Sequence, residues 1–212
     1  DAKAALTSTL SSLNARYGDR FLFAGDATAS LPFPDPAGLL SDIEQIAQTA
    51  TSTAEFQAQV DTYFTSPTGG WLQDVYQGST TTSDPEGVNA NHDAIRSLVT
   101  DLVILAVGGP DGGLSRLDGY GQLLQDTSLS LSSSETDITN LRADLGVFEE
   151  RIANELTSLD TQETILVASF NQLTARDQYE AATELQALEA TLEASYLLTA
   201  RLSQLSLLNY LG

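Results

Sequence analysis

The chain of 212 residues has no cysteine and no methionine, and it contains a single tryptophan and a single histidine. Without cysteine there is neither a disulfide framework nor a thiolate metal site. The same absence is compatible with an exported protein that must pass a narrow channel unfolded. Without methionine the native start codon is not represented, so we expect either a processed chain or a fragment.

Basic residues are scarce, because 9 lysines and arginines stand against 29 acidic residues, which gives a formal net charge of −20. Nucleic acids and anionic membrane surfaces both bind cationic faces, so this balance argues against either as a partner. Long hydrophobic runs are also missing. The most apolar segments are Leu102–Val107 and Leu202–Leu211, and both fall short of the roughly 20 residues that span a bilayer. We therefore expect a soluble protein.

Glycine and proline are absent from the whole stretch between Val147 and Leu211, which is far longer than an ordinary globular helix. Its apolar residues recur every three or four positions, a spacing typical of a coiled-coil seam. We predict one helix from about 114 to 173 and a second from 177 to 211. The joint is expected at Thr174–Asp177, with Asp177 as the N-cap of the second helix.

The two halves of this stretch are expected to pack differently. The spacing in Val147–Leu173 favours packing inside the chain, because helices predicted nearer the N-terminus are available as partners. After Arg201 the apolar residues cover nearly all sides of the helix, and such a helix must be enclosed by a partner. Glutamates 180, 184, 189 and 193 form an acidic row, which is either a solvated face or a face toward arginines of a neighbour.

The remaining elements are predicted from apolar spacing and from turn residues. In chain order we expect a helix over 2–17, an extended segment over 20–25, an irregular connector over 31–36, helices over 37–49 and 54–64, a short strand over 71–76, and a helix over 89–107. An aromatic cluster around Trp71 is expected to form core. Together these elements predict a mainly α fold, with long helices in a coiled-coil-like rod and a small mixed α/β middle module.

No pattern in the sequence supports catalysis or a cofactor, so we expect no enzyme and no bound cofactor. His92 lacks the second histidine or cysteine of a metal site and is expected at the surface or at a helix start. Residues 108–113 are rich in glycine but lack the Lys-Ser/Thr of a phosphate-binding loop. The acidic residues Asp84, Glu86, Asp111 and Asp118 do not have the spacing of a calcium-binding EF-hand.

Three segments near the C-terminus carry a family resemblance. They are Asp177-Gln-Tyr-Glu-Ala-Ala-Thr-Glu-Leu185, Leu192-Glu-Ala-Ser-Tyr196 and Leu205-Ser-Leu-Leu-Asn-Tyr-Leu211. In this order they resemble the C-terminal helix of the bacterial flagellin superfamily. The upstream Leu141-Arg-Ala-Asp-Leu-Gly146 followed by Arg151-Ile152 is similar to the preceding long helix of that family. The resemblance covers roughly residues 137–211 and implies a structural, extracellular protein of the flagellum.

A second sequence segment narrows the resemblance to one subfamily. Leu13-Asn-Ala-Arg-Tyr-Gly-Asp-Arg-Phe-Leu-Phe-Ala-Gly25 resembles a signature of hook–filament junction proteins of the FlgL type, also called hook-associated protein 3. The pair Pro32-Phe33 is in keeping with that subfamily. Family members begin with a long N-terminal helical region that pairs with the C-terminal helix, and here only Ala2–Tyr17 resembles the end of that region.

The resemblance implies four parts and a set of partners. The parts are the end of an N-terminal rod helix (1–17), a small outward-facing module (18–88), rod helices (89–174) and a C-terminal assembly helix (175–212). The implied partners are flagellin, another hook-associated junction protein, and further copies of the chain in a ring. The expected assembly interface comprises Leu185, Leu188, Leu192, Tyr196, Leu202, Leu205, Leu208 and Leu211. The alternatives are a filament flagellin or, in another class, a secreted coiled-coil or calcium-binding adhesin-like protein.

Overall fold

The computed structural model describes residues 2–84, 87–109 and 113–210, and side chains are described throughout these ranges except at 176–177 and 204–210. The chain divides into two units, Asp1–Glu149 and Glu150–Gly212. The predicted mainly α fold is confirmed, since nearly all regular elements are helices. The four-part division and the roles attached to it remain predictions.

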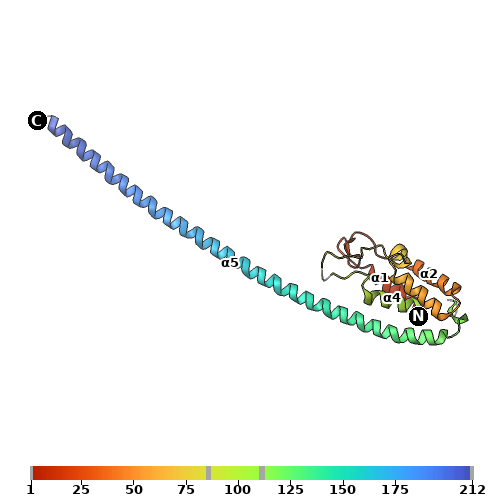
Figure 1. Cartoon of the computed structure of the whole chain (residues 1–212). Coiled ribbons are helices and arrows are strands. Elements are labelled where there is room, and N and C mark those ends of the chain that lie inside the picture. The colour runs from red at the N-terminus through yellow and green to blue at the C-terminus, as the bar shows by residue number, and fades with distance from the viewer. Residues whose placement is uncertain (1, 85–86, 110–112, 211–212) are drawn as a thin grey trace. The chain divides into compact units, whose positions relative to one another are not determined.

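The first unit contains helices α1, α2 and α4, which are labelled in Figure 1. The helices are α1 (Ala2–Leu13), α2 (Pro36–Thr49), α3 (Thr53–Thr65), α4 (Asp93–Val107) and α5 (Tyr120–Tyr210), of which α5 continues into the second unit. Two short helical turns are η1 (Trp71–Val75) and η2 (Leu114–Arg116). Strands β1 (Arg16–Tyr17) and β2 (Arg20–Phe21) form an antiparallel hairpin in which Tyr17 pairs with Arg20.

The core of the first unit lies where α1 and α2 pack against α4. Leu6 and Leu10 on α1 and Val99 and Val103 on α4 are at most 2% exposed, because each pair recurs at four-residue spacing on one helix face. The first turns of α5 add Leu123, among other residues, to this core.

The predicted helices 37–49 and 54–64 are confirmed as α2 and α3. Local capping explains where they begin. The Asp35 carboxylate accepts hydrogen bonds from the backbone N–H groups of Ala37 and Gly38, and the Ser52 hydroxyl accepts one from Glu55.

The first helix is shorter than predicted, because it ends at Leu13 and not at Tyr17. Asn14 turns the chain away from the helix: its side-chain amide donates to the Phe33 carbonyl at 2.8 Å and accepts from the Phe33 N–H at 2.9 Å. Gly18 then adopts φ +59°, which lets the chain reverse into the hairpin. The predicted extended segment over 20–25 is a strand only at Arg20–Phe21.

The predicted strand over 71–76 is wrong, because Trp71–Val75 forms one π-helical turn closed by a 2.7 Å bond from the Tyr76 N–H to the Trp71 carbonyl. This turn buries Trp71 completely. Its ring centroid lies 5.2 Å from that of Phe64, 5.4 Å from that of Phe33 and 6.2 Å from that of Tyr76. The prediction that this aromatic cluster is core is confirmed.

Two long helices begin later than predicted. Helix α4 begins at Asp93, where the His92 Nδ1 atom accepts the Ala94 N–H, and this confirms His92 as a helix-start residue. Helix α5 begins at Tyr120, not near 114, because Leu114–Arg116 forms a separate 3₁₀ turn. The Arg116 guanidinium donates to the carbonyls of Ala47, Gln48 and Ala50. These bonds give partners to carbonyl groups at the C-terminal end of α2.

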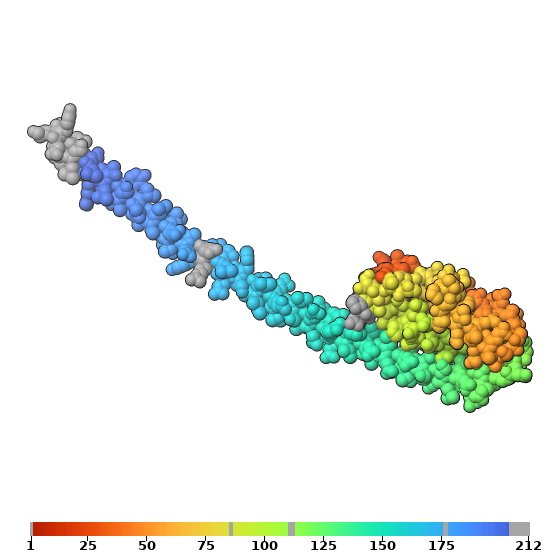
Figure 2. All heavy atoms as spheres, viewed as in Figure 1, coloured from red at the N-terminus to blue at the C-terminus, as the bar shows by residue number. Residues whose placement is uncertain are grey.

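All described residues of the second unit belong to α5, and the joint predicted at Thr174–Asp177 is wrong because the backbone there is helical. The segment has no glycine or proline to end the helix. Within this unit Leu156, Phe170 and Leu173 are each more than 60% exposed, and the predicted internal packing of Val147–Leu173 remains a prediction. Figure 2 shows the described atoms beyond residue 150 as a column one helix wide. Within the described residues, no helix combines the length and apolarity needed to cross a membrane.

Candidate assembly surface

The candidate surface predicted from the sequence is an apolar stripe on the C-terminal part of α5. Leu185, Leu188, Leu192, Tyr196 and Leu202 are between 50% and 72% exposed. At 100° per residue, these side chains lie within roughly one third of the helix circumference. We call these five residues the seam. Leu205 and Leu208 have side chains outside the described set, and Leu211 lies outside the described residues altogether.

The seam meets a shallow depression on the helix surface. Ala181, Glu184, Leu185, Ala187, Leu188 and Thr191 line it, and its volume is about 550 Å³. The small alanines leave space between the two leucines, and Glu184 places a carboxylate at the edge. We call this feature the helix depression. It offers an apolar floor with a negative rim, which suits a partner carrying an apolar side chain and a cation.

Exposed apolar side chains also occur along α5 on the N-terminal side of the seam. Every described side chain from 150 to 203 is exposed, and the large apolar ones include Ile152, Leu159, Leu166 and Phe170. A helix whose described side chains are exposed over this length is rare in globular proteins, where most helix stability comes from packing. The arrangement fits a helix that finds its packing partners in an assembly.

A second exposed surface lies at the hairpin in the first unit. The Arg16 guanidinium sits 4.9 Å from the centroid of the Phe21 ring and 4.0 Å from the Asp19 carboxylate. Tyr17, the β1 residue paired with Arg20, is 81% exposed, and Leu22 is 52% exposed. The hairpin therefore presents large apolar side chains to solvent next to its arginines.

The segment after the hairpin is held by a network of hydrogen bonds. The Asp26 carboxylate accepts the Ser83 N–H at 2.6 Å and the Thr81 hydroxyl at 2.9 Å. The bond from the Ser83 N–H is the main cause that lowers the pKa of Asp26, and the Ser83 and Thr81 side chains add to it. The Tyr76 hydroxyl donates to the carbonyls of Phe23 and Ser79, and burial raises the pKa of Tyr76 to about 12. These bonds join residues 23–26 to residues 76–83.

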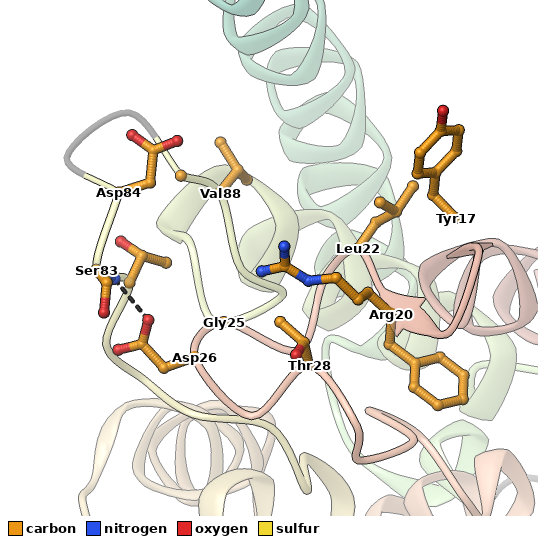
Figure 3. Close-up of a pocket in the computed structure, with 12 residues that line it drawn as sticks. Tyr17, Arg20, Leu22, Gly25, Asp26, Thr28, Ser83, Asp84 and Val88 are labelled. Carbon is orange, nitrogen blue, oxygen red and sulfur yellow. Dashed lines mark hydrogen bonds between the residues drawn. The ribbon is translucent and has the colours of Figure 1, made fainter.

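Between these segments the surface is hollowed, with a volume of about 720 Å³. Figure 3 shows Arg20 reaching into this hollow, with Leu22 and Val88 on its wall and Asp26 bonded to Ser83 at one side. We call it the hairpin hollow. It has no group of acid, base and nucleophile arranged for catalysis, and no group of three possible metal ligands occurs in the part of the chain that the structure describes.

Comparison with known families bears on the region that carries the seam. Residues 129–211 match the family model described as the bacterial flagellin C-terminal helical region. The match supports the bacterial flagellin superfamily. Neither a curated protein nor a solved structure matches the chain. The matched region contains the seam and most of α5.

The matched family has a known role and location. Proteins of the flagellin family are structural and form the extracellular bacterial flagellum, and the match supports a flagellar structural subunit. The family is not enzymatic. Self-assembly into flagellar polymers is the family's mode of action, and the exposed seam of this chain is the kind of surface that such assembly requires.

Sequence reasoning located the seam but missed the exposed side chains of the hairpin. Tyr17 continues the helical spacing of Leu6, Leu10 and Leu13, so the sequence predicts a helix up to this residue. The available signal was Asn14 followed shortly by Gly18, since both residues favour turns. With a turn at these residues, Tyr17 falls beyond the end of the helix.

Proposed function

We propose that the chain is a structural subunit of the hook–filament junction that assembles by side-by-side packing of its long helix. The observation that carries the proposal is the seam of α5, whose five residues are at least 50% exposed inside the region that matches the flagellin C-terminal helical model. The junction assignment is supported by the resemblance of Leu13–Gly25 to the junction signature. Flagellin, another hook-associated protein and copies of the chain in a ring are the proposed partners.

The seam supports assembly on energetic grounds. Full burial of a leucine side chain contributes about 1.5–3 kcal/mol. Burial of five large apolar residues on one stripe therefore opposes the loss of translational and rotational freedom on association. The acidic composition, with a net charge of −20, keeps isolated copies apart until the apolar faces meet.

The seam is tested by charge substitution in flagellated cells. The variant Leu185→Glu/Leu188→Glu/Leu192→Glu adds three carboxylates on the seam. The matched control Thr183→Glu/Ala190→Glu/Ala194→Glu adds three carboxylates on the opposite helix face. We expect the first variant to be secreted without being incorporated into flagella and the control to be incorporated normally. Equal incorporation of both variants would remove the seam from the assembly mechanism.

The junction assignment is tested by position. Antibody-gold labelling of flagella should place the protein at one short zone where the hook meets the filament. Labelling along the entire filament would contradict the junction assignment and identify the alternative, a filament flagellin. The seam experiment is independent of this outcome, because both kinds of subunit assemble through helices.

A further inference from the structure

Arg20 in the hairpin hollow has no counterion in the part of the chain that the structure describes. It is exposed, and its guanidinium forms neither a hydrogen bond nor an ion pair with any described residue. The guanidinium of Arg16 is engaged within the hairpin itself. The Asp26 carboxylate on the wall of the hollow accepts hydrogen bonds from Ser83 and Thr81. The positive charge of Arg20 is thus available to a partner.

The side chains beside Arg20 are apolar and exposed. Tyr17 is 81% and Leu22 52% exposed, and Figure 3 shows both beside Arg20 at the hollow. An exposed tyrosine next to an arginine is a combination enriched at protein–protein interfaces. The hydrogen bonds of Asp26 fix the wall of the hollow, so little of it has to be ordered when a partner binds.

The first unit also carries a surface of opposite charge, which lies around Tyr63. The Tyr63 hydroxyl donates to the Asp42 carboxylate at 2.6 Å, and this bond joins α3 to α2. The Tyr63 ring lies against Gly70 at the start of η1. Burial raises the pKa of the Tyr63 hydroxyl, and the bond to Asp42 and the negative charges of Asp42 and Asp74 raise it further. Both carboxylates therefore lie near one phenol ring, and we call Asp42, Tyr63 and Asp74 the η1 face.

The η1 face has no cation of its own. Neither of its carboxylates forms an ion pair within the described residues, and Asp74 is exposed. The chain has only 9 basic residues against 29 acidic ones, and Lys3, Arg96 and Arg116 are already bound inside the first unit. Arg20 is thus one of the few cations that a copy can offer to the η1 face of a neighbour.

We propose that the hairpin hollow of one copy docks onto the η1 face of a second copy. Arg20 faces Asp42 and Asp74, and Tyr17 packs against the Tyr63 ring. Copies with a net charge of −20 repel one another, so local pairs of opposite charge guide the two surfaces into register. Neither surface lies on α5, so the seam stays available for packing between long helices.

The docking deepens the proposed function by giving the first unit its own contact in the assembly. It rests on self-assembly but not on the junction assignment. The hairpin hollow and the η1 face are different patches, so one copy can use its hollow on one neighbour and its η1 face on another. Such a head-to-tail contact repeats from copy to copy and closes into a ring when the rotation between copies allows it.

The test uses the full chain in solution and measures self-association by analytical ultracentrifugation at low salt. We expect Arg20→Glu and Asp74→Arg each to weaken association at least about fivefold, which corresponds to about 1 kcal/mol. The double variant Arg20→Glu/Asp74→Arg should restore the wild-type affinity. The matched controls Arg142→Glu and Asp118→Arg reverse other exposed charges of the first unit and should leave association unchanged.

Cross-linking supplies a second readout, and the absence of native cysteine makes it specific. A Leu22→Cys chain is mixed with a size-tagged Gln73→Cys chain under oxidising conditions, since Gln73 is exposed next to Asp74. The mixed disulfide is quantified by size. The control replaces Leu22→Cys by Leu129→Cys, because Leu129 is also exposed. We expect the Leu22 mixture to give several times more mixed disulfide than the control.

Compensation in the double variant together with preferential cross-linking supports the docking. A monomeric wild-type chain, unchanged association of either charge variant, weakening without compensation, or equal cross-linking of the Leu129 control overturns it. Failure of the docking while the seam variant is still excluded from flagella leaves the proposed assembly through α5 standing. Normal incorporation of the seam variant, or gold label along the whole filament, with intact compensation counts against the proposed function and leaves the docking in place.

Discussion

Asp101 on α4 and Ser134 on α5 form a buried hydrogen bond in which the serine Oγ donates to the carboxylate at 2.7 Å. Ser130, one helical turn earlier, donates to the same carboxylate oxygen at 3.1 Å. Asp101 is 7% exposed and Ser134 3% exposed, and no cation is paired with Asp101 in the described parts of the chain. The carboxylate therefore fastens α5 to α4 through two hydroxyl groups alone.

We predict that Ser134→Ala lowers the free energy of unfolding of the first unit by about 1.5–3 kcal/mol, because a buried carboxylate loses a hydrogen bond. Ser133→Ala removes the neighbouring hydroxyl, which is exposed, and should change stability by less than about 0.5 kcal/mol. Urea unfolding followed by tryptophan fluorescence measures both. Similar values for the two variants would show that the bond to Asp101 contributes little.

The pH dependence of stability should reveal the buried carboxylate. Burial raises the pKa of Asp101, and the bonds from Ser134 and Ser130 offset part of this effect. Because the folded pKa lies above the unfolded value of 3.8, ionised Asp101 costs folding free energy above the folded pKa. That cost disappears as the pH falls through the folded pKa toward the unfolded one.

Asp101→Asn cannot ionise, so its stability relative to the wild type should rise as the pH rises from about 4 to neutral. Urea titrations of both proteins across this range measure the difference directly. A relative stability that falls toward neutral pH would mean that the two serine bonds outweigh the effect of burial on the carboxylate.

Unfolding should occur in two transitions. Trp71 is the only tryptophan and lies in the core of the first unit, so its fluorescence reports that unit. The described side chains from 150 to 203 are all exposed, and a helix without packing is marginally stable in water. At low protein concentration we expect part of the helical circular dichroism to be lost at lower urea than the fluorescence change. Raising the concentration should move the two curves together, whereas coincident curves at every concentration would contradict the prediction.

Two glycines should respond in opposite directions to alanine. Gly25 has φ +59°, and an added Cβ would collide with the carbonyl oxygens of Ser79 and Thr81. Gly25→Ala should therefore destabilise the first unit by more than about 1 kcal/mol. Gly146 is helical with nothing within 4 Å of an added Cβ, so Gly146→Ala should stabilise α5 by about 0.5–1 kcal/mol. Thermal unfolding of both variants measures the sign, and a neutral Gly25→Ala would show that the loop adjusts freely.

The amphipathic helices of the first unit were predictable because local signals agree with packing. Asp35-Pro36 and Ser52 mark the starts of α2 and α3, and apolar residues at helical spacing mark the buried face. The strand predicted at Trp71–Tyr76 failed for the opposite reason. Its aromatic composition favours strands, but contacts with Phe33 and Phe64 select a π-helical turn that buries the indole ring.

The two candidate surfaces also differ in whether the sequence predicts them. The seam follows from the spacing of Leu185, Leu188 and Leu192, because helical periodicity alone puts them on one face. The hairpin hollow does not follow from spacing along the sequence, since its parts lie far apart in the chain. Hydrogen bonds between Asp26 and Ser83 and between Tyr76 and Phe23 join these parts. No local pattern encodes such bonds.

The sequence by itself determined that the C-terminal third is helical, acidic and apolar on one face, since the absence of glycine and proline and a regular spacing suffice for that. Only the tertiary structure decided which apolar residues find partners within the chain. Leu6 and Leu10 are buried against α4. Leu156 and Leu188 also belong to rows of apolar residues at helical spacing, but they are exposed. The physical reason is that periodicity specifies a face, while burial depends on whether another element is present to cover it.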